Sequence, residues 1–310
     1  MEFEHIPVLL DEVVEGLAIR PSGIYVDCTV GGGGHSSEIC RRLTTGRLIA
    51  IDQDEDALSS ARKRLSAWRD RVSFHHANFE SLADVLAEER IDFVDGILMD
   101  IGVSSYQLDA GERGFSYRED APLDMRMDRR HQRTAAQIVN TYDEEQLAEI
   151  FWRYGEERWG KRIAQFVVAA RKERLIETTG DLVDVIKKAV PKGARSGGKH
   201  PAKKVFQALR IEVNRELEVL ESALNTAIDR LAPGGRLCVI TFHSLEDRLA
   251  KRVLKEKAQR CICPPEAPVC TCHHVPEVVL ITRKPIAASD EELKRNQRAH
   301  SAKLRVVEKI

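Results

Sequence analysis

The 310-residue sequence has no apolar stretch that approaches the roughly 20 residues needed to cross a bilayer, which excludes a membrane-spanning helix. The N-terminal segment carries acidic side chains where a secretory signal would be basic. The formal net charge is only -1, so the molecule as a whole does not attract nucleic acid, and any such attraction must come from local clusters. We therefore expect a cytoplasmic protein without a membrane partner.

What is present is the composition of an ordinary globular protein, with 43% hydrophobic and 31% charged residues. From residue 22 onward, strand-like runs alternate with helix-like patterns. The first four predicted strands cover 24–27, 47–51, 72–75 and 94–99. Such alternation is typical of an α/β protein with a parallel sheet and helices on both faces.

A change of pattern after Asp100 predicts a helical insertion. Its predicted helices cover 134–140, 143–153, 161–174 and 181–189, and an exposed loop follows at 191–201. The α/β pattern then returns with a long helix over 206–231, a strand at 236–241, a helix at 245–257, and strand-like runs at 278–282 and 304–307. We predict an α/β domain formed by 1–109 and 214–310, interrupted by a helical domain at 110–213.

A glycine-rich turn follows the first predicted strand and indicates a site for a nucleotide-like ligand. That strand ends at Asp27, and the glycines at 31–34 let the backbone approach a ligand closely before a helix begins. Asp52 ends the second strand, 21 residues after Gly31, where a carboxylate can accept hydrogen bonds from ribose hydroxyls. The pattern alone fits a methyltransferase or an NAD enzyme. A tight turn beside helix-capping aspartates is the alternative without a ligand.

Two features favour S-adenosylmethionine over NAD as that ligand. A dinucleotide fingerprint has a small residue at its sixth position, whereas Ser36 stands there and His35 intrudes on the turn. A pyrophosphate also benefits from an open helix N-terminus, while S-adenosylmethionine has no phosphate and carries a sulfonium. The carboxylates of Asp52 and Asp100 suit a ligand with ribose hydroxyls, an ammonium group and a sulfonium.

Several longer segments of low degeneracy occur in order along the chain. They are HIPVLL at 5–10, DCTVGGGGHS at 27–36, MDIGVSS at 99–105, RGFSY at 113–117, PLDMRMD at 122–128, YGEER at 154–158, KHPA at 199–202, FQALR at 206–210 and FHSLEDR at 242–248. On these segments, over essentially its whole length, the sequence resembles the RsmH (MraW) family, the N4-cytidine methyltransferases of 16S ribosomal RNA.

The resemblance implies a class I S-adenosylmethionine methyltransferase (Rossmann-like) fold with an inserted helical domain. The substrate it implies is a cytidine in the P-site or decoding region of 16S rRNA in the small ribosomal subunit. It also implies cofactor contacts at Gly33, Gly34, His35, Asp52, Phe79, Asp100 and Gln107. Phe79 follows the third strand, where its ring can flank the adenine, and Gln107 lies past the fourth strand near the expected methionine end.

Asp100 is the first catalytic candidate. Methyl transfer to an exocyclic amine is an in-line displacement, so positioning and electrostatics dominate. We expect Asp100 to orient cofactor and amine as a hydrogen-bond acceptor, with Ser104, Ser105 and His243 as further candidates for holding the base. The Asn/Asp-Pro-Pro-aromatic segment of many DNA amino-methyltransferases is absent after the fourth strand, so the N4 position rests on the resemblance alone.

The residues that begin the helix after the fifth strand can also be interpreted as a helix cap. We expect Ser244 to cap this helix, with Asp247 as its capping-box partner. His243 would then be left to face the crevice at the carboxyl ends of the strands.

Basic residues concentrate in the predicted insertion. Residues 187–210 contain eight Lys or Arg and no Asp or Glu, and a second cluster of arginines opens the insertion. An ordinary solvated face is the alternative, but a bare methyltransferase fold does not need this insertion. The RNA-binding candidates are Arg126, Arg129, Arg130, Lys192, Arg195, Lys199, Lys203 and Lys204. A target base in folded RNA must be unstacked to reach the crevice.

Four of the seven cysteines form a pattern similar to a metal knuckle, Cys261, Cys263, Cys270 and Cys272. Structural zinc usually takes cysteine pairs two to four residues apart, and C-x-C is tighter than that. We therefore expect free thiols and assign no metal. No motif places a thiol beside the base, so a nucleophilic cysteine is not expected.

Two rival functions remain open at this point. An NAD-linked oxidoreductase would use a similar sheet, but the glycine spacing and the lack of hydride-transfer residues count against it. A non-catalytic RNA-binding assembly factor would be supported by an eroded cofactor loop, whereas Gly33, Gly34, Asp52 and Asp100 are all intact. The sequence does not distinguish naked RNA from an assembled subunit as substrate, and it does not indicate an oligomeric state.

Overall fold

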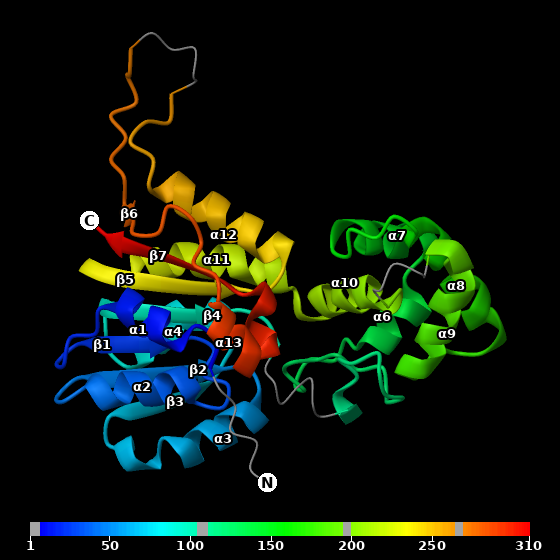
Figure 1. Ribbon diagram of the computed structural model, residues 1–310, viewed down its shortest axis with the longest axis horizontal. Coiled ribbons are helices and arrows are strands. Elements are labelled where there is room, and N and C mark those ends of the chain that lie inside the picture. The colour runs from blue at the N-terminus through cyan, green and yellow to red at the C-terminus, as the bar shows by residue number, and fades with distance from the viewer. Residues whose placement is uncertain (1–6, 104–110, 195–199, 264–268) are drawn as a thin grey trace. The chain divides into compact units, whose positions relative to one another are not determined.

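The computed structural model describes residues 7–103, 111–194, 200–263 and 269–310. It separates into two compact units (Figure 1), one formed by Met1–Gly102 with Leu217–Ile310 and the other by Val103–Glu216. The chain thus leaves the first unit and returns to it, at positions that differ by a few residues from the domain limits predicted above. We describe each unit by itself.

The first unit contains a seven-stranded sheet with the order β3-β2-β1-β4-β5-β7-β6. The strands are β1 (Ile24–Asp27), β2 (Arg47–Asp52), β3 (Val72–His76), β4 (Val94–Asp100), β5 (Leu231–Thr241), β6 (Val278–Leu280) and β7 (Lys303–Lys309). Strands β1 to β5 pair in parallel, and β7 runs antiparallel between β5 and β6. The strand order reverses between β1 and β4, which places a crevice at their carboxyl ends. This arrangement confirms the predicted class I methyltransferase sheet, and the strand-like runs at 278–282 and 304–307 form its antiparallel strands β6 and β7.

Alternating side chains of the strands divide the core into two layers. Leu48 and Ala50 of β2 pack on one face with α1 (Leu10–Leu17), α2 (Gly34–Arg42) and α3 (Glu55–Arg64). Ile49 and Ile51 pack on the other face with α4 (Leu82–Glu88), α11 (Glu216–Asp229) and α12 (Ser244–Lys257). The strands are buried on both faces, which is why they appear in the sequence as continuous apolar runs.

The second unit is helical. It comprises α6 (Ala135–Thr141), α7 (Glu144–Arg153), α8 (Gly160–Glu173), α9 (Thr179–Ala189) and α10 (Ala202–Asn214). Capping boxes define where three of these helices begin, because Thr134, Asp143 and Thr178 each accept from the third helical residue, whose side chain bonds back. The four helices predicted for 134–189 are therefore confirmed. In the part of the chain that the structure describes, no helix is long and apolar enough to span a membrane.

Two predictions about helices are wrong. The long helix over 206–231 is two helices, α10 and α11, because Arg215 adopts a left-handed conformation with φ of 51° and interrupts the hydrogen-bond ladder. The helix after β5 is capped by His243 rather than Ser244, since the His243 side chain accepts from the backbone of Glu246 and the Glu246 side chain completes the capping box. Two short helices had no predicted counterpart, α1 and α13 (Asp290–Arg295).

Candidate active site

The glycine turn between β1 and α2 needs glycine for conformational and steric reasons. Gly31 and Gly33 have positive φ values of 51° and 76°, which side-chain-bearing residues rarely adopt. A Cβ atom on Gly34 would lie 2.3 Å from the Pro7 ring. Around Gly32, by contrast, a Cβ would meet nothing within 4 Å. The turn is thus packed against the protein on one side and open on the other, as a ligand cradle requires.

Asp27, at the end of β1, accepts hydrogen bonds from residues on both sides of this turn. The residue is only 1% exposed. It accepts hydrogen bonds from the Thr29 backbone at 3.1 Å and the Ser36 hydroxyl at 2.7 Å. Burial raises the pKa of Asp27 to about 6 in spite of these bonds. Ser36, which breaks the dinucleotide pattern, therefore has a specific partner. Asp27 was recognised as a strand end but not as a site residue.

Asp52 lies at the end of β2, as predicted for a ribose-binding carboxylate. Its Oδ2 accepts from the Gly31 backbone at 2.8 Å, and its Oδ1 accepts from the Asp54 backbone at 2.9 Å. Burial, together with the nearby charges of Asp54 and Asp27, raises the pKa of Asp52 to about 7. Each oxygen retains acceptor capacity for a ligand hydroxyl.

Asp100 ends β4, the strand beside β1 at the reversal of strand order. Its backbone donates to the Thr29 hydroxyl at 2.7 Å, which fixes the residue next to the glycine turn. Its Oδ1 is buried and accepts no hydrogen bond from the residues described. Burial raises the pKa of Asp100 to about 8, with further contributions from Asp27 and Glu246. Among Asp27, Asp52 and Asp100, the pKa of Asp100 is therefore raised the most.

His35 connects Asp100 to the N-terminal part of the chain. Its Nε2 lies 2.9 Å from the Val8 carbonyl oxygen, and its Nδ1 lies 3.8 Å from Asp100 Oδ2. Because a carbonyl only accepts, Nε2 carries the proton in this contact, and in the neutral ring Nδ1 is left as an acceptor. His35 as a whole is 7% exposed. The contacts give His35 a role in shaping the wall of the crevice.

The three aspartates thus form a carboxylate cluster at the carboxyl ends of β1, β2 and β4. Among the described residues, no Lys or Arg forms an ion pair with Asp27, Asp52 or Asp100. Buried negative charge without a cation is unfavourable, and the raised pKa values express this. A cationic ligand would relieve it. The cluster therefore has the electrostatics of a site for a ligand with positive groups.

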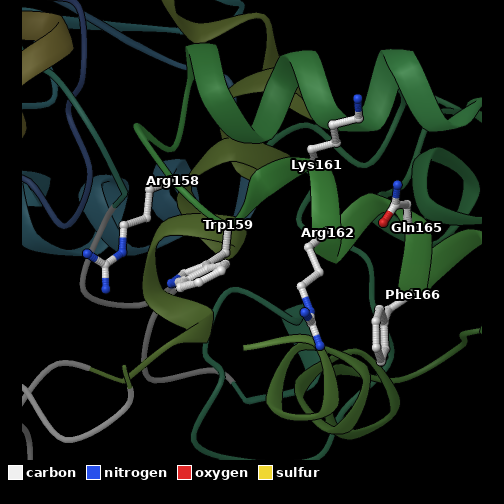
Figure 2. A pocket seen from close by; sticks show the side chains of 6 residues that line it. All are labelled: Arg158, Trp159, Lys161, Arg162, Gln165 and Phe166. Atoms are coloured by element: carbon white, nitrogen blue, oxygen red, sulfur yellow. The ribbon is translucent and has the colours of Figure 1, made fainter. Parts of the chain in front are cut away.

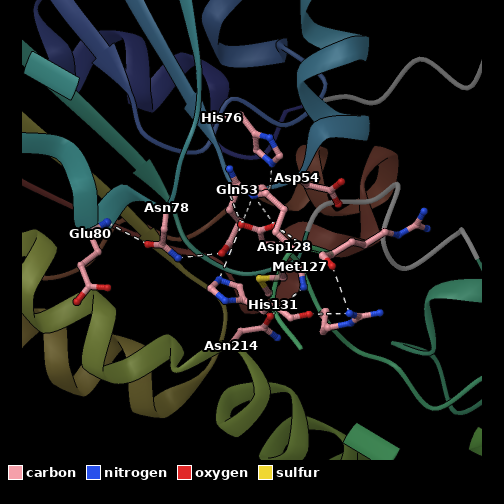
Figure 3. A network of polar contacts seen from close by, with 12 residues as sticks. Gln53, Asp54, His76, Asn78, Glu80, Met127, Asp128, His131 and Asn214 are labelled. Carbon is pink, nitrogen blue, oxygen red and sulfur yellow. Dashed lines mark hydrogen bonds and ion pairs between the residues drawn. The ribbon is translucent and has the colours of Figure 1, made fainter. Parts of the chain in front are cut away.

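A polar network after β3 (Figure 3) holds Asn78, the residue that precedes Phe79. The Asn78 side chain donates to the Gln53 side chain at 2.8 Å and accepts from the Glu80 backbone at 3.0 Å, while the His76 ring contacts the Gln53 carbonyl. Asn78 in this way caps the short helix Phe79–Ser81. The Phe79 ring is 8% exposed and packs in the core beside β2 and β4.

His243 lies against Glu246, the third residue of the helix that it caps. Its Nε2 lies 2.9 Å from Glu246 Oε1, and Glu246 Oε2 accepts from the Phe242 backbone at 2.8 Å. Glu246 is completely buried, and no pattern in the sequence indicates this. These contacts assign His243 a structural role at the end of β5, and a direct role at the base stays a prediction. Ser104, Ser105 and Gln107 lie outside the described residues.

The predicted arginine cluster of the second unit is largely paired within the protein. Arg126 forms two hydrogen bonds of 2.7 Å with Asp124. Arg130 pairs with Asp128 at 2.7 Å. Arg129 is exposed, and no partner for its guanidinium is found among the described residues. Arg129 is thus the arginine of this cluster with the most freedom to meet a phosphate.

The lysines of the basic segment 187–210 are at the surface. Lys192, Lys203 and Lys204 are exposed, and Lys204 Nζ donates to the Glu156 carbonyl at 2.5 Å. The two remaining candidates, Arg195 and Lys199, lie outside the described residues.

A basic groove at the start of α8 was not predicted (Figure 2). It has a volume of about 490 Å³ and is lined by Arg158, Trp159, Lys161, Arg162, Gln165 and Phe166. The guanidinium of Arg158 lies 5.4 Å from the Trp159 ring, and that of Arg162 lies 5.4 Å from the Phe166 ring. Cations beside aromatic rings are suited to phosphates and stacked bases. Hereafter we call this feature the α8 groove.

Comparison with known proteins identifies the family. The model of the MraW methylase family matches residues 2–310. The chain belongs to this family. Curated relatives named ribosomal RNA small subunit methyltransferase H include that of Finegoldia magna, with 56% identity over 100% of both chains. Those of Symbiobacterium thermophilum and Clostridioides difficile have 57% and 55% identity, over 100% of this chain and 98% and 100% of theirs.

Proposed function

We propose that this protein transfers a methyl group from S-adenosylmethionine to the N4 amine of a cytidine in the P-site region of 16S rRNA. The observation that carries the proposal is the carboxylate cluster of Asp27, Asp52 and Asp100 around an open glycine turn. Membership of a methylase family agrees with it, and so do relatives named for small-subunit ribosomal RNA.

The residues present fit the proposed cofactor. S-adenosylmethionine supplies an electrophilic methyl group on a sulfonium, and it also carries an ammonium group and a ribose diol. Asp52 would accept hydrogen bonds from the ribose hydroxyls, as its free acceptor capacity allows. Asp100, with a buried oxygen that lacks a hydrogen bond among the described residues, would face the positive end. Gly33, Gly34 and His35 would form the wall, with Phe79 and Gln107 as the remaining predicted contacts.

Asp100 is also the proposed catalytic residue. The N4 lone pair is delocalised into the cytosine ring, so an acceptor for an N4 hydrogen helps to orient the nitrogen in line with the methyl group. When the new N–C bond forms, the S–C bond breaks and the nitrogen then releases one proton. Asp100 can hold that proton, because burial raises the pKa of its carboxyl group to about 8. Ser104, Ser105 and His243 remain candidates for holding the base.

The second unit is the proposed RNA-recognition domain. The α8 groove combines three cations with two aromatic rings, and Arg129, Lys192, Lys203 and Lys204 add exposed positive charge. Cations of this kind bind phosphates with an affinity that falls as salt rises. The paired Arg126 and Arg130 would contribute less, since Asp124 and Asp128 already neutralise them.

Transfer of labelled methyl groups tests this proposal against the assembly-factor alternative. Purified protein would be incubated with methyl-labelled S-adenosylmethionine and either naked 16S rRNA or small subunits that lack the modification. We expect label in RNA with at least one of these substrates, and loss of label with Asp100→Asn. Cofactor binding without label in either substrate would overturn the enzymatic proposal and favour an assembly factor.

A further inference from the structure

The loop between α12 and β6 brings four cysteine sulfurs together. The Sγ atoms of Cys261, Cys263, Cys270 and Cys272 lie within 4.8 Å of one another. The distances from Cys270 Sγ are 3.4 Å to Cys261 and 3.5 Å to Cys272, and Cys272 lies 3.8 Å from Cys261. All four are free thiols. The two C-x-C pairs are separated in sequence and meet in space.

These distances match a tetrahedral metal centre. With metal–sulfur bonds of about 2.3 Å, neighbouring sulfurs of a tetrahedral zinc site are about 3.8 Å apart. A disulfide would need an S–S distance of about 2.05 Å, and it would join the sulfurs in pairs rather than gather all four. The tight C-x-C spacing is compatible with this geometry, because each pair forms one edge of the group of four sulfurs.

In the described part of this loop, few contacts besides those among the four sulfurs hold its shape. Its base is closed by the Lys257–Glu277 ion pair at 2.7 Å. Beyond the base, Ile262, Val269 and Val275 are 61%, 70% and 72% exposed, so they form no core. Figure 1 shows the described residues 258–263 and 269–277 extending away from α12 and β6. A segment this small usually needs a metal or a disulfide to order it.

We propose that Cys261, Cys263, Cys270 and Cys272 bind one structural zinc ion. The four sulfurs fill the coordination sphere, so the site is closed and holds no position for substrate. Each Zn–S bond forms as its thiol releases a proton to solvent, and no electron is transferred. This inference stands apart from the proposed function, because the glycine turn and the carboxylate cluster do not involve this loop.

Metal analysis of the full-length protein tests the inference. Protein purified under reducing conditions without chelator is expected to contain one zinc per chain by plasma mass spectrometry. Replacement of zinc by cobalt is expected to give the sulfur-to-cobalt charge-transfer absorption and the intense visible bands of a tetrahedral thiolate site. The double variant Cys261→Ser/Cys270→Ser, which removes one ligand from each pair, is expected to lose both signals.

Ile262→Ser is the matched control, because Ile262 lies between two of the cysteines and its exposed side chain contributes no ligand. It is expected to retain the metal. Absence of zinc and of cobalt bands in the reduced wild-type protein would overturn the inference. So would metal that remains in the double variant, or mass-spectrometric evidence that the four cysteines are paired as disulfides in the protein as purified.

Discussion

The Asp52 carboxylate accepts a 2.8 Å hydrogen bond from the Gly31 backbone, which joins the end of β2 to the glycine turn after β1. Two residues that are 21 positions apart in the sequence thus form one wall of the crevice. The same carboxylate is the proposed partner of the ribose hydroxyls. A ligand that bonds to Asp52 would therefore also order the turn that contacts the rest of the cofactor.

Replacement of Asp52 tests this coupling. Asp52→Ala removes the acceptor for the ribose and the support of the Gly31 backbone, so we expect the affinity for S-adenosylmethionine to fall about 10- to 100-fold, since a hydrogen bond to a charged group contributes about 1.5–3 kcal/mol. Isothermal titration calorimetry measures the change. Asp84→Asn, at an exposed position in the first turn of α4, is the control. Unchanged affinity in Asp52→Ala would rule out the ribose role.

Cofactor binding should depend on pH. Burial raises the pKa of Asp100 to about 8 and that of Asp52 to about 7, so both carboxyl groups are partly protonated near neutral pH in the free protein. A cationic ligand favours their charged forms. We therefore expect the affinity for S-adenosylmethionine to rise as pH increases from 6 to 9, with proton release on binding.

S-adenosylhomocysteine is the matched ligand for this experiment, because it lacks the sulfonium charge but retains the ammonium group and the ribose. Its affinity is expected to rise less steeply over the same pH range. Equal pH dependence of the two ligands would contradict a contribution of the sulfonium to the carboxylate cluster.

Replacement of Asp100 should raise the stability of the cofactor-free protein at high pH, although it lowers the methyltransferase activity. A carboxyl group whose pKa is raised by folding stabilises the protein fully below its unfolded pKa, and this contribution is lost as pH rises through the folded value of about 8. Asp100→Asn cannot ionise. We expect it to melt at a higher temperature than wild type at pH 9, by roughly 2–4 °C for each ~1 kcal/mol regained.

Scanning calorimetry at pH 6 and pH 9 checks this prediction. At pH 6 Asp100 is mostly protonated in the folded protein, although the unfolded carboxyl group is already ionised, so the two proteins should differ less than at pH 9. A variant that is less stable than wild type at pH 9 would show that the Asp100 carboxylate forms stabilising contacts in its charged state.

The α8 groove should affect RNA affinity without affecting cofactor affinity. Arg158→Ala/Arg162→Ala removes two exposed cations, and we expect binding of 16S rRNA to weaken and to become less dependent on salt. Filter binding at several salt concentrations measures both effects. Lys172→Ala, at the opposite end of α8, is a control for loss of charge on the same helix. Equal losses in the control and in the double variant would argue against a specific role of the groove.

Much of the fold could be predicted because it depends on local patterns. The apolar runs of β1, β2 and β4 and the aspartates that end β2 and β4 are visible in the sequence, and the structure has them at those ends. The break at Arg215 was missed because a left-handed non-glycine residue has no clear sequence signal. His243 was missed as a cap because histidine is not among the usual capping residues.

The missed features of the site depend on contacts between distant residues. Asp27 gains its importance from the Ser36 hydroxyl and from burial, which the strand pattern alone does not reveal. The cations of the α8 groove are spread over the start of one helix and do not form a run. Likewise, the two C-x-C pairs appear too tight for zinc individually, and their suitability depends on how the loop brings them together.

The central claim is tested most directly by the identity of the methylated nucleoside. Small-subunit rRNA would be treated with purified protein and methyl-labelled cofactor, digested to nucleosides and analysed by mass spectrometry, with Asp100→Ala in parallel. We expect the label in N4-methylcytidine and its loss in the variant. Label in 5-methylcytidine, in a ribose-methylated nucleoside or in another base would contradict transfer to the cytidine N4 amine.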